Sequence, residues 1–321
     1  MANFKYSADL LDDALQRAGE KIDGTSNFET RALRYLNRVY QSVWSGGFEL
    51  DPSVSETWWW LRSTTPGVIT MNPIKDSGTV SVTNNSTTAT LSATTTPSLA
   101  GRFLRVNGHA DVFRISAHTS GTDALTLDSV YTGSTDTAAS YRIMQIDYTL
   151  ASDCRSILQP VRAYQDKQSF VNGIEPSALS RNWPLRDLQP GVPQEFAEVG
   201  DQTIRFSHCG GTSSTDLIRI DYDYLVIPAD LTDGASEEPL VPYEYRRMLA
   251  DYTLMYLFAD KHDSRAADAG NLALQGLRAM AAENKRRHIR MSTHPGGILP
   301  RPSNTFKNRS PLRTSSGLII G

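Results

Sequence analysis

Apolar residues near the start of the chain recur with the 3.6-residue period of an α-helix. In "NFETRALRYLNRVYQSVWSGG", at 27–47, they fall on one face at i, i+3, i+4, i+7, i+8 and i+11: Ala32, Tyr35, Leu36, Val39, Tyr40 and Val43. A shorter helix is predicted for "ADLLDDALQRAG", with Ser7 as the N-cap and Gly19 as the stop. The pattern therefore predicts two amphipathic helices at this end of the chain.

The helical period returns near the other end of the chain. The stretches "YEYRRMLADYTLMYLFADKH" and "SRAADAGNLALQGLRAMAAENKRRH" each place apolar residues along one face. Small residues on the second stretch, Ala269, Ala273 and Gly276, permit close approach of another helix. Two helices near each terminus predict one bundle in which the two ends of the chain meet.

Between the helices the pattern changes to short runs with a two-residue period. From about Gly67 to Tyr148 the chain is rich in Thr, Ser and Gly, with hairpin signals such as Asn107-Gly108. Strands spaced by about ten residues are typical of a small β-sandwich or barrel. Further strands are predicted in "QEFAEVGDQTIRFSH" and "DLIRIDYDYLVIP".

These patterns together predict an α+β fold. We expect a helical bundle core from both ends of the chain with antiparallel β elements, an inserted small β-sandwich or barrel domain, and an extended C-terminal tail. The predicted boundaries are 1–66 plus 149–290 for the helical/β core, 67–148 for the inserted β domain, and 291–321 for the tail.

The tail differs from the rest of the chain in charge. From Lys285 to Gly321 there are eight Lys or Arg residues and no Asp or Glu, so subtracting this +8 from the net charge of −3 leaves −11 for residues 1–284. Dedicated DNA-binding domains instead carry positive charge on a folded face. Being rich in Pro, Gly, Ser and Asn, the tail is not expected to fold alone, yet it closes on Leu318, Ile319 and Ile320.

The sequence gives little support for catalysis. His208-Cys209 precedes two glycines and is best interpreted as a hairpin tip, while Asp221 and Asp223 fit a solvated strand face as well as a cation site. The sequence contains no phosphate-binding loop, dinucleotide fingerprint or zinc spacing. We therefore expect no enzyme activity, no cofactor and no metal.

The sequence also indicates where the protein resides. The N-terminus lacks the features of a signal peptide, and no apolar run approaches the roughly 20 residues that span a bilayer. Cys154 and Cys209 are far apart, which is typical of free thiols in a reducing compartment. A soluble intracellular protein is expected.

Two further groups of residues are candidates for interaction. Arg31, Arg34 and Arg38 share a helix face, which could contact phosphates but is more often a solvated or interface face. Trp58, Trp59 and Trp60 are consecutive and cannot all face one core. At least one is expected to pack elsewhere, against the inserted domain or a neighbouring subunit, with packing inside the chain favoured.

The segment from "IRIDYDYLVIPADLTDGASEEPLVPYEYRRMLADY" to "KHDSRAADAGNLALQGLRAM" resembles the C-terminal half of head-to-tail connector proteins of tailed bacteriophages. Similar proteins carry a strand, an acidic turn, a Tyr-rich helix and a long Ala-rich helix. The "ALRYLNRVYQSVW" stretch is similar to their first long helix, and the β segment looks like small modules of phage neck and tail proteins. The matching residues are Pro228, Asp230, Leu231, Thr232, Pro239, Pro242, Tyr243, Arg246, Asp263 and Ala266. One departure is the large insert, which compact adaptors of short-tailed phages lack.

The resemblance implies a late structural protein of the virion neck, made in the host cytoplasm. Such proteins form a ring, commonly of twelve copies, below the portal ring, with a tail or nozzle protein on the opposite side. The genome passes through during ejection as double-stranded DNA, without sequence-specific binding, and no membrane is involved. The tail is expected to dock onto the portal through Arg301, Phe306, Lys307, Arg309, Arg313, Leu318, Ile319 and Ile320.

Alternative functions remain open from the sequence. The chain could bind nucleic acid through its basic tail, although the acidic body and the apolar tip count against this. It could be another neck or tail-tube component, such as a head-closure protein. A carbohydrate-recognition module is a third possibility, because Ser/Thr-rich β domains with exposed Trp can bind sugars.

Overall fold

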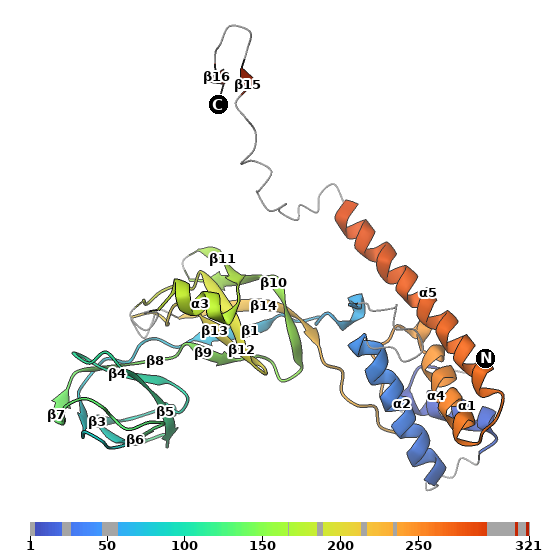
Figure 1. The fold of residues 1–321 in the computed structure, drawn as a ribbon, viewed down its shortest axis with the longest axis horizontal. Coiled ribbons are helices and arrows are strands. Elements are labelled where there is room, and N and C mark those ends of the chain that lie inside the picture. Colours follow the sequence, from blue (N-terminus) through green and yellow to red (C-terminus); the bar gives the residue numbers. More distant parts are fainter. Residues whose placement is uncertain are drawn as a thin grey trace. The chain divides into compact units, whose positions relative to one another are not determined.

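The computed structural model describes residues 4–20, 27–46, 57–165, 167–184, 189–212, 217–233 and 236–287, and the backbone of 288–293, 312–313 and 319–320. The chain forms two units, which are described separately (Figure 1). The helical unit consists of Met1–Leu61 and Pro228–Gly321, and the β unit of Arg62–Ile227.

The helical unit is organised around a central helix. α4 (Arg247–Asp260) packs against α1 (Ser7–Ala18), α2 (Asn27–Ser45) and α5 (Ala266–Thr293). Because it has neighbours on several sides, α4 is buried over most of its circumference rather than on one face. Its shared core with the other helices consists of Leu11, Ala14, Leu15, Ala18, Ala32, Leu254, Leu257, Phe258 and Ala269.

Local chemistry sets the ends of these helices. Gly19 adopts the left-handed conformation (φ 73°) that ends α1, and the Asp9 carboxylate accepts a hydrogen bond from the Tyr6 amide at 3.0 Å. Asp263 precedes α5 and accepts a bond from the Arg265 amide at 2.9 Å. The described part of the unit also contains two short 3-10 helices, η1 (Trp59–Leu61) and η3 (Tyr243–Tyr245).

The small residues of α5 bring it close to α4. A Cβ atom added at Gly276 would lie 2.9 Å from the Met248 Cβ, closer than real Cβ contacts allow. Ala269 and Ala273 are buried on the same helix. The small-residue face of α5 is thus occupied within the chain, by α4.

One sheet of the β unit combines strands from both of its ends. Its order is β1 (Gly67–Met71), β14 (Ile218–Val226), β10 (Cys154–Tyr164), β11 (Gln168–Gly173), β12 (Glu195–Gly200), β13 (Thr203–Phe206) and β9 (Asp147–Thr149). All neighbours are antiparallel except β11 and β12. A short helix, α3 (Pro176–Asn182), follows β11.

The other sheet is a nearly closed barrel. Its order is β7 (Asp136–Ala139), β2 (Val80–Val82), β3 (Thr88–Thr95), β6 (Thr122–Leu127), β5 (Val112–His118), β4 (Phe103–Val106) and β8 (Tyr141–Met144). The edge strands β7 and β8 are separated in sequence only by Ser140, so the sheet must curl until its edges come together (Figure 1). The alternating apolar residues of its strands fill the interior.

The structure corrects the predicted fold class. A helical bundle core carrying a small inserted β domain is wrong, because strands dominate the chain and form two seven-stranded, barrel-like sheets. The strands after residue 149 were expected to accompany the helices. They instead pair with β1 to build a complete sheet of their own. Such long-range pairing leaves little trace in a local pattern.

Candidate functional site

The C-terminal tail contains one described structural feature. β15 (Leu312–Arg313) and β16 (Ile319–Ile320) pair antiparallel, with Leu312 opposite Ile320 and Arg313 opposite Ile319. Three predicted docking residues, Arg313, Ile319 and Ile320, therefore share this ribbon. The remaining five lie outside the described residues: Arg301, Phe306, Lys307, Arg309 and Leu318.

The predicted arginine stripe lies on the exposed face of α2. Arg31, Arg34 and Arg38 are all exposed. Arg31 forms an ion pair with Asp260 of α4 at 3.4 Å, and Arg38 lies over the Tyr256 ring at 5.0 Å. At least two of the three guanidinium groups thus contact α4.

A stack of tyrosines lies beneath this stripe and was not expected from the sequence. The Tyr35 and Tyr256 rings are 5.3 Å apart, and Tyr252 stacks on Tyr256 at 5.5 Å. The Tyr35 hydroxyl donates to the Asp260 carboxylate at 2.7 Å, and this hydrogen bond raises the pKa of Tyr35. The i, i+4 spacing of Tyr252 and Tyr256 was a local signal for their stacking. The pairing with α2 had no such signal.

The three consecutive tryptophans have different environments in the helical unit. Trp58 is fully buried, and its indole N–H donates to the Val43 carbonyl at 2.6 Å. Trp59 is half-buried under the Arg287 guanidinium of α5, 4.5 Å from the ring centroid. Trp60 stacks on Trp58 at 6.3 Å. All three side chains thus have contacts within this unit.

Arg246, one of the residues carrying the resemblance, joins several segments. Its guanidinium donates to the carbonyls of Val241, Lys5 and Pro239 at 2.7, 2.6 and 2.8 Å, and to the Glu238 carboxylate at 3.0 Å. The side chain is only 8% exposed. Arg246 therefore ties the N-terminus to the segment that precedes α4.

The acidic turn is also bonded to the helices on both sides. The Asn37 side chain of α2 exchanges two hydrogen bonds with the Leu231 backbone, at 2.8 and 2.7 Å. Ser7 of α1 donates its hydroxyl to the Thr232 carbonyl at 2.7 Å. The Leu240 amide donates to the Tyr40 hydroxyl at 3.0 Å. These bonds tie Leu231, Thr232 and Leu240 to the two N-terminal helices, α1 and α2.

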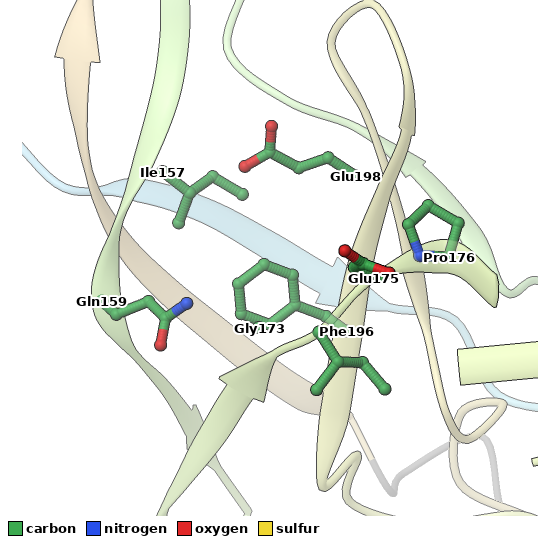
Figure 2. Close-up of a pocket in the computed structure, with 8 residues that line it drawn as sticks. Ile157, Gln159, Gly173, Glu175, Pro176, Phe196 and Glu198 are labelled. Atoms are coloured by element: carbon green, nitrogen blue, oxygen red, sulfur yellow. The ribbon is translucent and has the colours of Figure 1, made fainter. Parts of the chain in front are cut away.

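The β unit has an open pocket of about 510 Å³ at the C-terminal end of β11. Ile157 and Gln159 of β10 form one side, and Phe196 and Glu198 of β12 form the other (Figure 2). Glu175, just after β11, adds a second carboxylate. Both glutamates are exposed. The pocket is an acidic surface hollow rather than an enclosed reaction site.

The cysteines, the histidine and the aspartates considered for catalysis are either buried or paired with other side chains. Both cysteines are buried, and burial raises the pKa of Cys154 to about 11, which disfavours the nucleophilic thiolate. Burial also lowers the pKa of His208, whose Nδ1 lies 2.8 Å from the Ser207 hydroxyl. Asp221 pairs with Arg219 at 2.7 Å, and Asp223 with Arg62 at 2.7 Å.

The described residues contain neither a cluster of metal ligands nor a membrane-spanning helix. No three His, Cys, Asp or Glu side chains in this part of the chain gather so as to hold a metal ion. Among the same residues, none of the helices has the length and apolar character needed to cross a membrane.

Comparison with known proteins adds no relative. No family model matches the chain, and no curated protein matches it. The likeness to phage connectors therefore remains a resemblance of residue patterns.

Proposed function

We propose that the chain is a structural protein of a tailed-phage neck. In this proposal it forms a ring below the portal, connects head to tail, and surrounds the channel for the genome. The main support is that Arg246 and the acidic turn, which carry the resemblance, are also the residues that join the two chain ends in the helical unit. The motif thus has a structural role, which favours a shared architecture over chance similarity.

The proposed portal anchor is the arm, by which we mean the part of the chain that follows α5. α5 runs for 28 residues, and the arm beyond it carries the basic residues and the β15–β16 ribbon. An isolated two-stranded ribbon is marginally stable in water, so a partner surface is needed to hold it. We infer that the ribbon binds an acidic surface of the portal. Its apolar residues would pack against that surface, and its unpaired strand edges would extend a portal sheet.

Charge supports passage of DNA rather than its retention. Residues 1–284 carry −11, whereas each phosphate neutralised by a protein cation adds salt-dependent affinity. A ring whose body is acidic is expected to let the duplex slide. The basic arm is then available for the portal.

The ring contacts need surfaces other than the small-residue face of α5, which α4 covers. Among the described residues of the helical unit, four large apolar side chains are exposed: Phe28, Leu240, Tyr243 and Leu272. Such residues are suited to the heterologous contacts that close a ring. We assign the subunit contacts to this group.

Portal binding by tail variants tests the proposal against a nucleic-acid-binding function. Two full-length variants are compared with the natural chain in co-sedimentation with portal rings of the phage that encodes it. One replaces Arg301, Lys307, Arg309 and Arg313 with Ser. The other replaces Ile319 and Ile320 with Ser. A connector is expected to lose portal binding in both variants.

The same variants define the contradicting result. If neither change affects portal binding, while the arginine and lysine replacements alone abolish binding to free duplex DNA, the connector proposal is wrong. A salt-steep affinity for free DNA in the natural chain would then support the nucleic-acid-binding function.

A further inference from the structure

A second pocket of the β unit, of about 360 Å³, is lined by three parts of the chain. These are residues of 72–77, which follow β1, residues of 95–102 between the end of β3 and the start of β4, and Thr212. Its size lies at the lower end of small-molecule sites, where a single sugar-sized ligand fits. The pocket is separate from the acidic hollow at Glu175 and Glu198.

Arg102 is the unusual residue of this pocket. It is only 9% exposed, yet its guanidinium makes no hydrogen bond, ion pair or ring contact with any residue that the structure describes. Only its backbone is bonded, through the Leu99 carbonyl at 3.1 Å and the Ile115 amide at 2.8 Å. Burial lowers the pKa of Arg102, because desolvation disfavours its charged form, and the nearby Tyr148 hydroxyl opposes this shift only in part.

A mostly buried cation without a bonded anion carries a desolvation cost that an anionic ligand can offset. A folded protein that keeps such a group in a pocket can satisfy it with a ligand. The guanidinium presents its donors in a planar fork that matches a carboxylate bidentately. The ligand should therefore bring an oxyanion to Arg102.

The other polar groups narrow the ligand class. Lys75 and Arg102 against Asp76 give the lining a formal charge of about +1, which a single carboxylate neutralises and a doubly charged phosphate exceeds. The Asp76 carboxylate can accept hydrogen bonds from ligand hydroxyls and would repel a second negative group. Hydroxyls of Ser77, Thr95, Thr96 and Thr212 add donors and acceptors.

We propose that this pocket binds a small hydroxyl-bearing carboxylate of the uronic acid class. The carboxylate lies on Arg102, and the sugar hydroxyls are held by Asp76 and the neighbouring Ser and Thr side chains. The inference stands apart from the connector proposal, because it involves no residue of the arm or of the helical unit.

Calorimetric titration of the full-length protein tests the site with four probes: D-glucuronate, D-glucose, acetate and inorganic phosphate. Glucuronate is expected to bind about tenfold or more tightly than acetate, because only glucuronate adds hydroxyl contacts to the carboxylate. Glucose is expected not to bind, because it leaves Arg102 unpaired. Tighter binding of phosphate than of glucuronate would overturn the assignment.

Three variants locate the binding. Arg102→Met should abolish glucuronate binding, and Arg102→Lys should weaken it about tenfold by removing the bidentate fork. Arg114→Met, at an exposed arginine of the same barrel, is the matched control and should bind as the natural chain does. Unchanged binding by Arg102→Met would refute the proposal. Because the Lys variant keeps the charge, it remains informative should the Met variant fail to fold.

Discussion

The helical unit and the β unit each contain a buried arginine, and the two are used in opposite ways. Arg246 is 7% exposed and its guanidinium has four acceptors, three of them backbone carbonyls. Arg102 is 9% exposed and its guanidinium has no partner in the described part of the chain. Residue type and burial are nearly the same, so neither distinguishes a structural arginine from a binding one. The two kinds of arginine are distinguished by the number of hydrogen-bond acceptors around the guanidinium.

The largest expected effect is at Arg246. Arg246→Met removes the donor to three backbone carbonyls, which then lose a partner in or near the interior, and to the half-exposed Glu238 carboxylate. Breaking such a buried set typically costs about 3–5 kcal/mol of unfolding free energy. Urea unfolding followed by tryptophan fluorescence measures it. The control is Arg286→Met, whose side chain is largely exposed and whose loss should cost about 0.5 kcal/mol or less. If Arg246→Met and Arg286→Met cost the same free energy of unfolding, Arg246 does not have the structural role assigned to it.

Two glycines test how tightly each unit packs. A Cβ added at Gly210, in the β unit, would lie 1.9 Å from the Asn72 carbonyl oxygen, so the backbone must move. A Cβ at Gly276, in the helical unit, meets the Met248 side chain at 2.9 Å instead. The free energy of unfolding should fall by about 1–3 kcal/mol in both Ala variants, with Gly210→Ala at the upper end.

The glycine variants also bear on the uronic acid site. Asn72 lines the second pocket, so Gly210→Ala should weaken glucuronate binding while Gly276→Ala leaves it unchanged. Thermal denaturation and titration of both variants measure the two effects. A larger loss of stability in Gly276→Ala than in Gly210→Ala would show that the β unit accommodates an added methyl group more easily than the helical unit does.

A smaller, pH-dependent effect is expected at Tyr40. Burial raises the pKa of Tyr40 to about 12. Because the fold favours the neutral phenol, this stabilisation is fully present below about pH 10 and is lost as the pH rises through about 12. Tyr40→Phe should cost about 1 kcal/mol near neutral pH, by leaving the Leu240 amide without its acceptor.

Unfolding free energies measured between pH 8 and pH 12 check this prediction. The natural chain should lose more stability over that interval than Tyr40→Phe does. Cys154 has its pKa raised by burial to about 11 in both proteins, so its contribution cancels in the difference. Parallel curves for the two proteins would contradict the prediction.

The smallest effect is expected at Arg102. Without ligand, Arg102→Met should leave the free energy of unfolding unchanged or raise it by about 1 kcal/mol, because an unpaired charge is exchanged for an apolar side chain. Thermal and urea denaturation of the ligand-free protein measure the change. A loss comparable to that of Arg246→Met would mean that Arg102 also holds the fold together.

Some features could be predicted from the sequence because they are local. The face of α2 follows from its period, and the turns at Asn85 and Gly108 follow from residues that tolerate positive φ. The pairing of β1 with β14 joins residues about 150 positions apart and has no local signal. This is why the strands after residue 149 were expected to accompany the helices.

The candidate site was less accessible to sequence reasoning. Arg246 stood in the resembling motif, but its acceptors come from residues 5 and 238–241 and emerge only in the fold. Arg102 had no distinguishing pattern, since its lack of partners is a property of three dimensions. Most of the predicted docking residues in the tail lie outside the described part of the chain, so their role stays a prediction.

The most direct test of the connector proposal is the mass of the portal ring after mixing with the purified full-length chain, measured by light scattering. We expect the mass to rise by a fixed multiple of the 35.4 kDa chain and then to saturate, as a closed ring requires. The chain truncated after Met291 is expected to add no mass. A portal mass that does not change with the full-length chain would contradict the proposal.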